Sequence, residues 1–126
     1  MATILLVDDD PLQALQHKSI LERRFPDVCR VANAAEALCL IQEQSFAGNL
    51  GLVVSGHHMP GLGGPAFVAE LLLRLPWLPV LVLGDMQEDP KVYKGERVRF
   101  LPRPIAAEIL LNLADQLLAQ KAHASA

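Results

Sequence analysis

Residues 52–64 read LVVSGHHMPGLGG, an apolar strand that runs into a turn rich in glycine and proline. The apolar part, Leu50–Ser55, has the continuous pattern of a strand that is buried on both faces. Pro65 follows and is well placed in the first turn of a helix. This stretch therefore predicts a strand, a loop and a helix, and a glycine, Gly56, stands where the strand opens into the loop.

The rest of the chain repeats this alternation of strands and helices. Four further apolar segments predict strands, at Thr3–Val7, Val28–Ala32, Leu78–Leu83 and Val98–Leu101. Helices are expected at Pro11–Phe25, after the capping-box pair Asn33 and Glu36, after Pro65, and from Pro104 onward, while residues 45–49 (SFAGN) are expected to form a loop. Strands that alternate with helices predict an α/β fold with a parallel sheet covered on both faces.

Length and composition narrow the class of protein. The 126 residues fit one domain, expected at residues 1–120 with a flexible tail or the start of a linker at 121–126. The net charge of −3 argues against a nucleic-acid binder that depends on electrostatic attraction. We find no export signal and no apolar run that is long enough to cross a bilayer, so we expect a cytoplasmic protein without membrane contact.

Ligands of such sheets bind beyond the carboxyl ends of the strands. The residues expected at that edge follow the first, third, fourth and fifth strands, and they are Asp8, Asp9 and Asp10, then Gly56 to Met59, then Gly84 and Asp85, and finally Pro102 to Pro104.

Four of these segments, in this order, resemble the receiver domain of two-component response regulators over nearly the whole chain. ILLVDDDP resembles its acidic-pair motif, LVVSGHHMPGLGG its phosphoacceptor segment, PVLVLGD its fourth strand and RFLPRPI its closing motif. The resemblance implies a flavodoxin-like (βα)5 doubly wound three-layer sandwich with a five-stranded parallel sheet. It also implies magnesium-dependent transfer of a phosphoryl group from a histidine kinase to an aspartate.

Three positions depart from the family pattern. Asp8 and Asp9 match the metal-binding carboxylates, but the phosphoacceptor aspartate falls on Gly56, the hydroxyl residue on Gly84 and the lysine on Arg103. An acyl phosphate forms only on a carboxylate oxygen placed in line with phosphorus, and glycine offers none. The neighbouring Ser55 cannot replace it, because adjacent strand residues point to opposite faces. We therefore predict a pseudo-receiver that is not an enzyme and lacks the standard reaction.

The same losses bear on metals and cofactors. Mg²⁺ prefers hard oxygen ligands, and without the third carboxylate it is expected to bind weakly at best, with no other cofactor. We predict that Arg103 lies across Asp8 and Asp9, because its planar guanidinium suits paired carboxylates. An alternative is a transition-metal site formed by Asp8, Asp9 and His58.

A basic segment precedes and includes the fifth strand. By resemblance it lies near the face that receivers use for partners, and the residues expected there are Tyr93, Lys94, Arg97, Arg99 and Phe100. Glycine and proline after Gly84 predict a shortened fourth helix. The expected partner is a signalling protein, either a kinase or an output domain. A homodimer through the apolar final helix is also plausible, and nucleic acid is not an expected partner.

The predicted function is thus signal transduction through protein–protein interaction. Two alternatives stay open from the sequence. One is a receiver that is still phosphorylated at Asp8, Asp9 or Asp10, and the other is a metal or small-ligand sensor that uses the vacated crevice.

Overall fold

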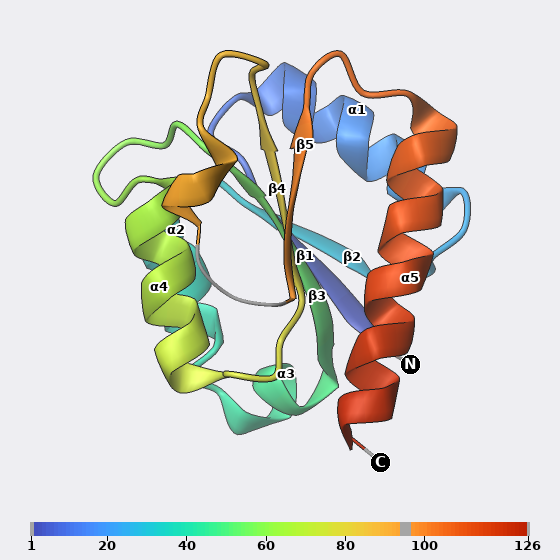
Figure 1. Cartoon of the computed structure of the whole chain (residues 1–126). Helices are drawn as coiled ribbons and strands as arrows, with labels where there is room; N and C mark the ends of the chain where they lie inside the picture. The colour runs from blue at the N-terminus through green and yellow to red at the C-terminus, as the bar shows by residue number, and fades with distance from the viewer. Residues whose placement is uncertain (1, 94–96, 126) are drawn as a thin grey trace.

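The structure, a computed structural model, describes residues 2–93 and 97–125. Its centre is a five-stranded parallel sheet in the order β2-β1-β3-β4-β5 (Figure 1). The strands are β1 (Thr3–Val7), β2 (Val28–Val31), β3 (Leu50–Gly56), β4 (Val80–Gly84) and β5 (Val98–Pro102). This is the flavodoxin-like order, so the fold class predicted from the sequence is confirmed.

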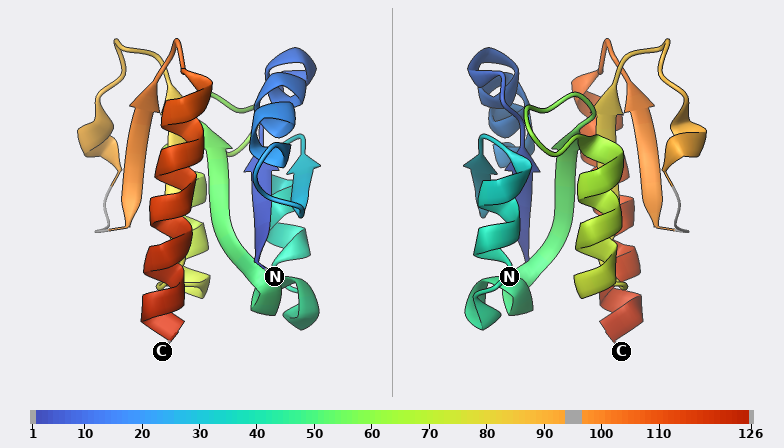
Figure 2. Two further views of the ribbon diagram at one scale, coloured as in Figure 1. Left: turned by 90° about the vertical axis from the view of Figure 1, so that its right-hand side faces the viewer. Right: turned by 90° about the vertical axis from the view of Figure 1, so that its left-hand side faces the viewer.

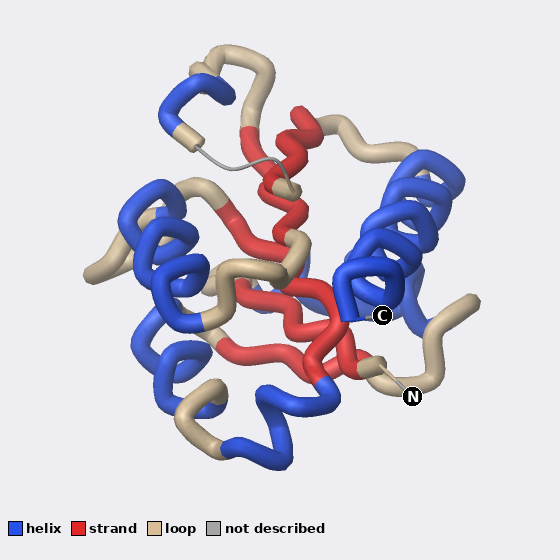
Figure 3. Tube along the Cα trace, turned by 60° about the horizontal axis from the view of Figure 1, so that its bottom comes forward, coloured by secondary structure: helices blue, strands red, loops and turns tan. Residues whose placement is uncertain are grey.

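Helices cover both faces of the sheet. They are α1 (Pro11–Glu22), α2 (Ala34–Leu40), α3 (Gln44–Asn49), α4 (Gly64–Arg74) and α5 (Ala107–Ser125), with a single 3-10 turn, η1, at Pro90–Val92. The two views of Figure 2 look at the two faces in turn, with α1 and α5 in front in one and α2 and α4 in front in the other. Figure 3 shows the sheet as the middle of three layers.

The strand periodicity of two explains the layers. On β1, Ile4 and Leu6 belong to the core beneath α1 and α5, whereas Leu5 and Val7 belong to the core beneath α2 and α4. All five residues of β1 are buried, as are those of β4. Strands buried on both faces read as unbroken apolar runs, which is why the sequence pattern identified them.

Two predicted irregular segments are helical. Residues 45–49, expected as a loop, belong to α3, which begins at Gln44. One glycine costs a helix only about 1 kcal/mol, and the backbone here is paired, since Ala47 N–H donates to the Glu43 carbonyl at 2.9 Å. Residues 121–125 continue α5, and their assignment as a flexible tail or the start of a linker stays a prediction.

Side chains cap the starts of α1 and α2, while α5, expected from Pro104, begins at Ala107. Asn33 Oδ1 accepts the N–H of Glu36 at 2.9 Å, and the Glu36 carboxylate accepts the N–H of Ala32 at 3.0 Å. Asp10 caps α1 by accepting the N–H groups of Leu12 and Gln13. In the described part of the segment after β4, the helical element is η1, which agrees with the prediction of a shortened fourth helix. Within the described residues, no helix is both long and apolar enough to cross a membrane.

Candidate functional site

The carboxyl ends of the strands meet at one crevice, as expected for this topology. Its pocket is lined by residues at the carboxyl ends of β1, β3, β4 and β5 and at the start of α1, namely Asp8, Asp9, Asp10, Gln13, Gly56, His57, His58, Leu83 and Arg103. The structure therefore brings part of each of the four expected segments to one edge.

The three aspartates after β1 have different environments. Asp8 is buried, its Oδ1 accepts the N–H of Asp10 at 3.0 Å, and burial raises the pKa of its carboxyl group. Asp10 is occupied as the cap of α1, and Asp9 is exposed at the pocket wall. The crevice thus offers the carboxylates of Asp8 and Asp9.

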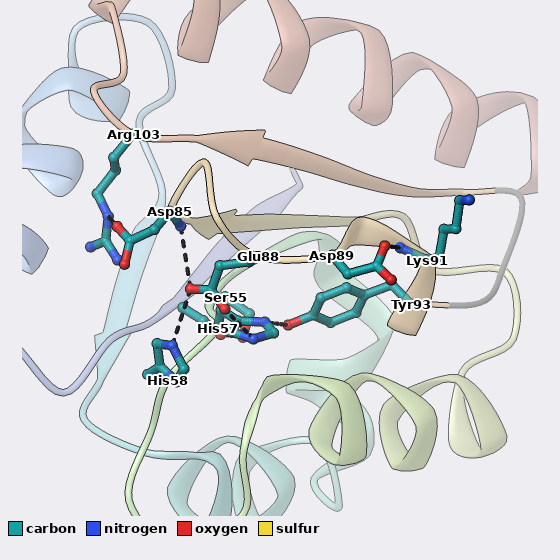
Figure 4. A network of polar contacts seen from close by, with 10 residues as sticks. Ser55, His57, His58, Asp85, Glu88, Asp89, Lys91, Tyr93 and Arg103 are labelled. Carbon is teal, nitrogen blue, oxygen red and sulfur yellow. Dashed lines mark hydrogen bonds and ion pairs between the residues drawn. The ribbon is translucent and has the colours of Figure 1, made fainter.

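Arg103 lines the crevice but does not bridge Asp8 and Asp9, so that prediction is wrong. Its Nε lies 3.4 Å from Asp85 Oδ1, and its Nη1 contacts the side-chain oxygen of Gln13. The reason is local, because Asp85 follows β4 directly and the Arg103 N–H donates to the Gly84 carbonyl at 2.7 Å. Figure 4 shows the guanidinium beside Asp85 and apart from the histidines.

Gly56 is the last residue of β3, and there is room beside it. A Cβ built at this position lies 3.7 Å from the Val7 carbonyl oxygen and 3.8 Å from Met59 Cγ, which is ordinary contact. The preceding Ser55 is fully buried, and its hydroxyl donates to the Gly56 carbonyl at 2.9 Å. A Cβ at residue 56 therefore fits without displacing its neighbours, and the Ser55 hydroxyl is engaged by the backbone.

Gly84, the last residue of β4, has no such space. A Cβ there lies 2.7 Å from Phe100 Cζ and 3.3 Å from His57 Cβ. The Phe100 ring thus occupies the volume that a residue with a side chain would need at position 84. A side chain at residue 84 would therefore require the Phe100 ring to move.

A polar network, which the sequence did not predict, links the loop after β3 to the segment after β4. Glu88 contacts His57 Nε2, and its Oε1 lies 3.1 Å from His58 Nε2. On the other side of the His57 ring, Nδ1 lies 2.6 Å from the Tyr93 hydroxyl. Figure 4 shows Glu88 between the two histidines and Tyr93 beyond His57.

This network revises the expected ligand set. Among residues 2–93 and 97–125, the cluster of potential ligand atoms is His57, His58 and Glu88, in place of the predicted group of Asp8, Asp9 and His58. Glu88 lies in the irregular segment GDMQED, where no periodicity or motif distinguished it from its acidic neighbours. Only the tertiary structure brings it to the histidines.

The residues predicted for a partner face also have other contacts. The Tyr93 hydroxyl is engaged by His57, and burial together with the charge of Glu88 raises the pKa of Tyr93. Phe100 turns toward Gly84 and His57, and Arg97 Nη1 donates to the Trp77 carbonyl at 2.7 Å. Arg99 is exposed on β5, and Lys94 lies outside the described residues.

His17 of α1 is a buried histidine near the crevice. Among the described residues, no group forms a hydrogen bond with its Nδ1. Desolvation lowers the pKa of His17 from its ordinary 6.5, the charge of Arg103 lowers it further, and the charge of Asp8 opposes both. The unfolded chain therefore binds a proton more readily than the folded one, and stability is lost as the pH falls below about 6.5.

We expect His17→Leu to raise the free energy of unfolding by about 1 kcal/mol at pH 7, because it removes a buried unpaired nitrogen. The difference in the free energy of unfolding between the variant and the natural chain should increase as the pH falls from about 7 to about 5. The reason is that only the natural chain takes up a proton at residue 17 on unfolding. Urea denaturation across this range measures both effects. His17→Gln is the control, expected to lose the pH dependence without the gain at neutral pH, and an unchanged pH dependence in both variants would contradict the assignment.

Comparison with known proteins agrees with this architecture. The family model described as "Response regulator receiver domain" matches residues 4–115. The chain is 28% identical over 120 residues to "Sensor kinase CckA" of Brucella abortus, covering 93% of this chain but 12% of that protein. It is 28% identical over 124 residues to "Protein PilH" of Pseudomonas aeruginosa, covering 94% of this chain and 99% of that protein.

Among solved structures, the fold is similar to that of a response regulator receiver domain protein from Clostridium thermocellum, with a TM-score of 0.88. The two chains are 20% identical, and the superposition covers 98% of this chain and 99% of that chain. At this identity the likeness supports the fold alone. The family match spans most of the chain, and the sheet order, the acidic residues after β1 and the crevice are those that the family resemblance implied. The chain therefore belongs to the response regulator receiver domain family.

Proposed function

We propose that this receiver domain acts in two-component signalling through protein–protein contacts and is not phosphorylated by the standard aspartyl mechanism. The observation that carries the proposal is Gly56, which ends β3 at the crevice and offers no nucleophilic oxygen. Phosphoryl transfer needs a nucleophile positioned in line with the reacting phosphorus. The crevice then serves as a fixed scaffold, and the domain is a regulatory module with no catalytic step of its own.

The conformation of the domain is proposed to depend on its contacts with a partner and not on phosphorylation. In receivers, by the resemblance, the aromatic residue of β5 responds to the hydroxyl residue that ends β4. Here the Phe100 ring lies against Gly84 and His57, with ring centroids of Phe100 and His57 6.3 Å apart. Because residue 84 is a glycine, there is no hydroxyl whose movement could shift the Phe100 ring. This supports a single ring conformation that a partner recognises.

The partner is proposed to be a protein of a cytoplasmic signalling pathway. One relative with a similar segment is named a sensor kinase, and the chain spans only 12% of it, whereas the chain spans nearly all of PilH. A kinase or an output domain is therefore the partner class that we propose.

The test is incubation of the purified protein with acetyl phosphate and Mg²⁺, followed by intact-mass measurement. We expect no added phosphoryl group, whereas a receiver with an aspartate at the equivalent position, treated in parallel, should be modified. A phosphoryl group recovered on the natural chain would contradict the proposal. Peptide mapping would then decide whether Asp8, Asp9 or Asp10 carries it, which is the alternative left open by the sequence.

A further inference from the structure

The cluster of His57, His58 and Glu88 brings two imidazoles and one carboxylate together, although Glu88 is distant from the histidines in the sequence. One potential ligand atom of each lies within 4.8 Å of the others. His58 Nε2 and Glu88 Oε1 lie 3.1 Å apart. In a tetrahedral Zn²⁺ site with bonds of about 2.0–2.1 Å, two ligand atoms are separated by roughly 3.3 Å. The two spacings are therefore similar.

The burial of the cluster favours a cation at this point. The side chain of Glu88 is 8% exposed and that of His57 is 14% exposed, so the carboxylate is largely removed from water. A buried carboxylate is costly unless a positive charge or hydrogen bonds compensate it. The Asp85 N–H donates to Glu88 Oε1 at 3.3 Å, and the two imidazoles beside the carboxylate either donate a proton to it or share a metal ion with it.

Tyr93 supplies the outer contact that such a site requires. Its hydroxyl lies 2.6 Å from His57 Nδ1, opposite the nitrogen that faces Glu88. Metal-binding histidines commonly donate their second ring N–H to an oxygen, which fixes the ring and directs the other nitrogen to the metal. When His57 donates Nδ1–H to Tyr93, the lone pair of its Nε2 faces the Glu88 carboxylate. A cation between these two groups would then be bound by both.

The site is also reachable. His58 is 76% exposed, and both histidines line the pockets at the carboxyl end of the sheet. Solvent can therefore provide a fourth ligand. Two imidazole nitrogens and one carboxylate oxygen suit Zn²⁺ and the neighbouring transition metals, while Mg²⁺ prefers sites made of oxygen atoms alone.

We propose that His57, His58 and Glu88 bind a divalent transition metal of the Zn²⁺ type. A bound ion joins the loop after β3 to the segment after β4 across the crevice, next to the Phe100 ring. The proposal does not rest on the proposed function, since it concerns ligands that aspartyl phosphorylation does not use. It differs from the sequence hypothesis of Asp8, Asp9 and His58 in its ligands and in its position.

The experiment is calorimetric titration of Zn²⁺ into the untagged chain after treatment with a chelator, with Mg²⁺ as the comparison ion. We expect one Zn²⁺ per chain and thermal stabilisation by Zn²⁺ at this stoichiometry. His58→Ala and Glu88→Gln should each weaken binding by at least about tenfold, the scale on which even outer contacts act. Co²⁺ in place of Zn²⁺ should give the visible absorption of a tetrahedral site, and this absorption should be lost in both variants.

Two control variants distinguish Zn²⁺ binding at this site from Zn²⁺ binding at other carboxylates. Glu70→Gln removes an exposed carboxylate that pairs with Arg74, and it should leave Zn²⁺ affinity unchanged. Asp9→Asn tests the alternative ligand set. Loss of binding in Asp9→Asn but not in Glu88→Gln would overturn the proposal, as would the absence of stoichiometric Zn²⁺ binding. Because His58 is exposed, His58→Ala is expected to fold, which circular dichroism without metal can verify.

Discussion

The Gly56→Asp variant is expected to accept a phosphoryl group from acetyl phosphate in the presence of Mg²⁺, while the natural chain accepts none. The substitution places a carboxylate at the end of β3, beside Asp8 and Asp9. Its Cβ meets no atom closer than 3.7 Å, so the backbone need not move. Intact-mass spectrometry measures the change, which is the appearance of a covalent product where none formed before.

The reaction of this variant should nevertheless be slow. Gly84 still provides no hydroxyl, and Arg103 pairs with Asp85 rather than with Asp8 or Asp9. Loss of one group that stabilises a transition state commonly lowers the rate by about 10²–10³-fold. We therefore expect labelling that takes far longer than in a receiver with all five family residues.

A change in stability should accompany the change in chemistry. Three neighbouring carboxylates repel one another, so the variant should unfold at a lower temperature than the natural chain in the absence of divalent ions. Mg²⁺ should restore much of this loss, because a cation that binds only the folded state stabilises it. Thermal denaturation with and without Mg²⁺ measures both effects.

The matched control for this variant is Gly63→Asp. It adds a carboxylate in the same loop, at a position where a Cβ meets nothing within 4 Å, and where aspartate suits the N-cap of α4. We expect no phosphorylation and no Mg²⁺ effect beyond that of the natural chain. Failure of Gly56→Asp to react would show that the missing nucleophile is not the main obstacle, and equal labelling of both variants would contradict the positional argument.

The sequence predicted the sheet because buried parallel strands carry their signal locally. The runs of β1, β3 and β4 are mostly apolar, and the carboxyl ends of parallel strands meet at one edge of the sheet. Asp8, Asp9 and Gly56 were placed correctly in the crevice for this reason. Short elements without a clear periodicity were not predicted, and α3 is helical where a loop was expected.

Side-chain partners across the crevice could not be predicted in the same way. Arg103 had several carboxylates within reach, and the choice of Asp85 depends on the orientation of its backbone after β5. Glu88 carries no pattern in the sequence, yet it is the carboxylate that meets His57 and His58. Such contacts depend on loop geometry, which periodicity does not encode.

A second large effect is expected at Gly64, the first residue of α4. A Cβ there contacts the Tyr93 hydroxyl and lies 2.8 Å from the His57 carbonyl oxygen. The Gly64 N–H donates to that same carbonyl at 2.9 Å, so the backbone cannot retreat without breaking a hydrogen bond. We expect Gly64→Ala to lower the free energy of unfolding by about 1–3 kcal/mol, the usual cost of overpacking.

Urea denaturation measures this loss, and Gly63→Ser is the control. Residue 63 precedes α4 with open space at its Cβ, and serine is a good N-cap, so this variant should be as stable as the natural chain or slightly more stable. Equal stability of Gly64→Ala and Gly63→Ser would contradict the close packing inferred at Gly64. Tyr93 is the single tyrosine of the chain, so its ring signals in an NMR spectrum report the local displacement directly.

Tyr93→Phe separates the two contacts that crowd Gly64. In the natural background it removes the hydroxyl that meets His57 and should cost about 1 kcal/mol. In the Gly64→Ala background the same change also removes one of the two clashes, so it should cost less or even stabilise the protein. The difference between the two backgrounds is a coupling energy, expected at about 1 kcal/mol for groups in direct contact. Additive effects would mean that the His57 carbonyl alone opposes a side chain at residue 64, and that the tyrosine moves aside without loss.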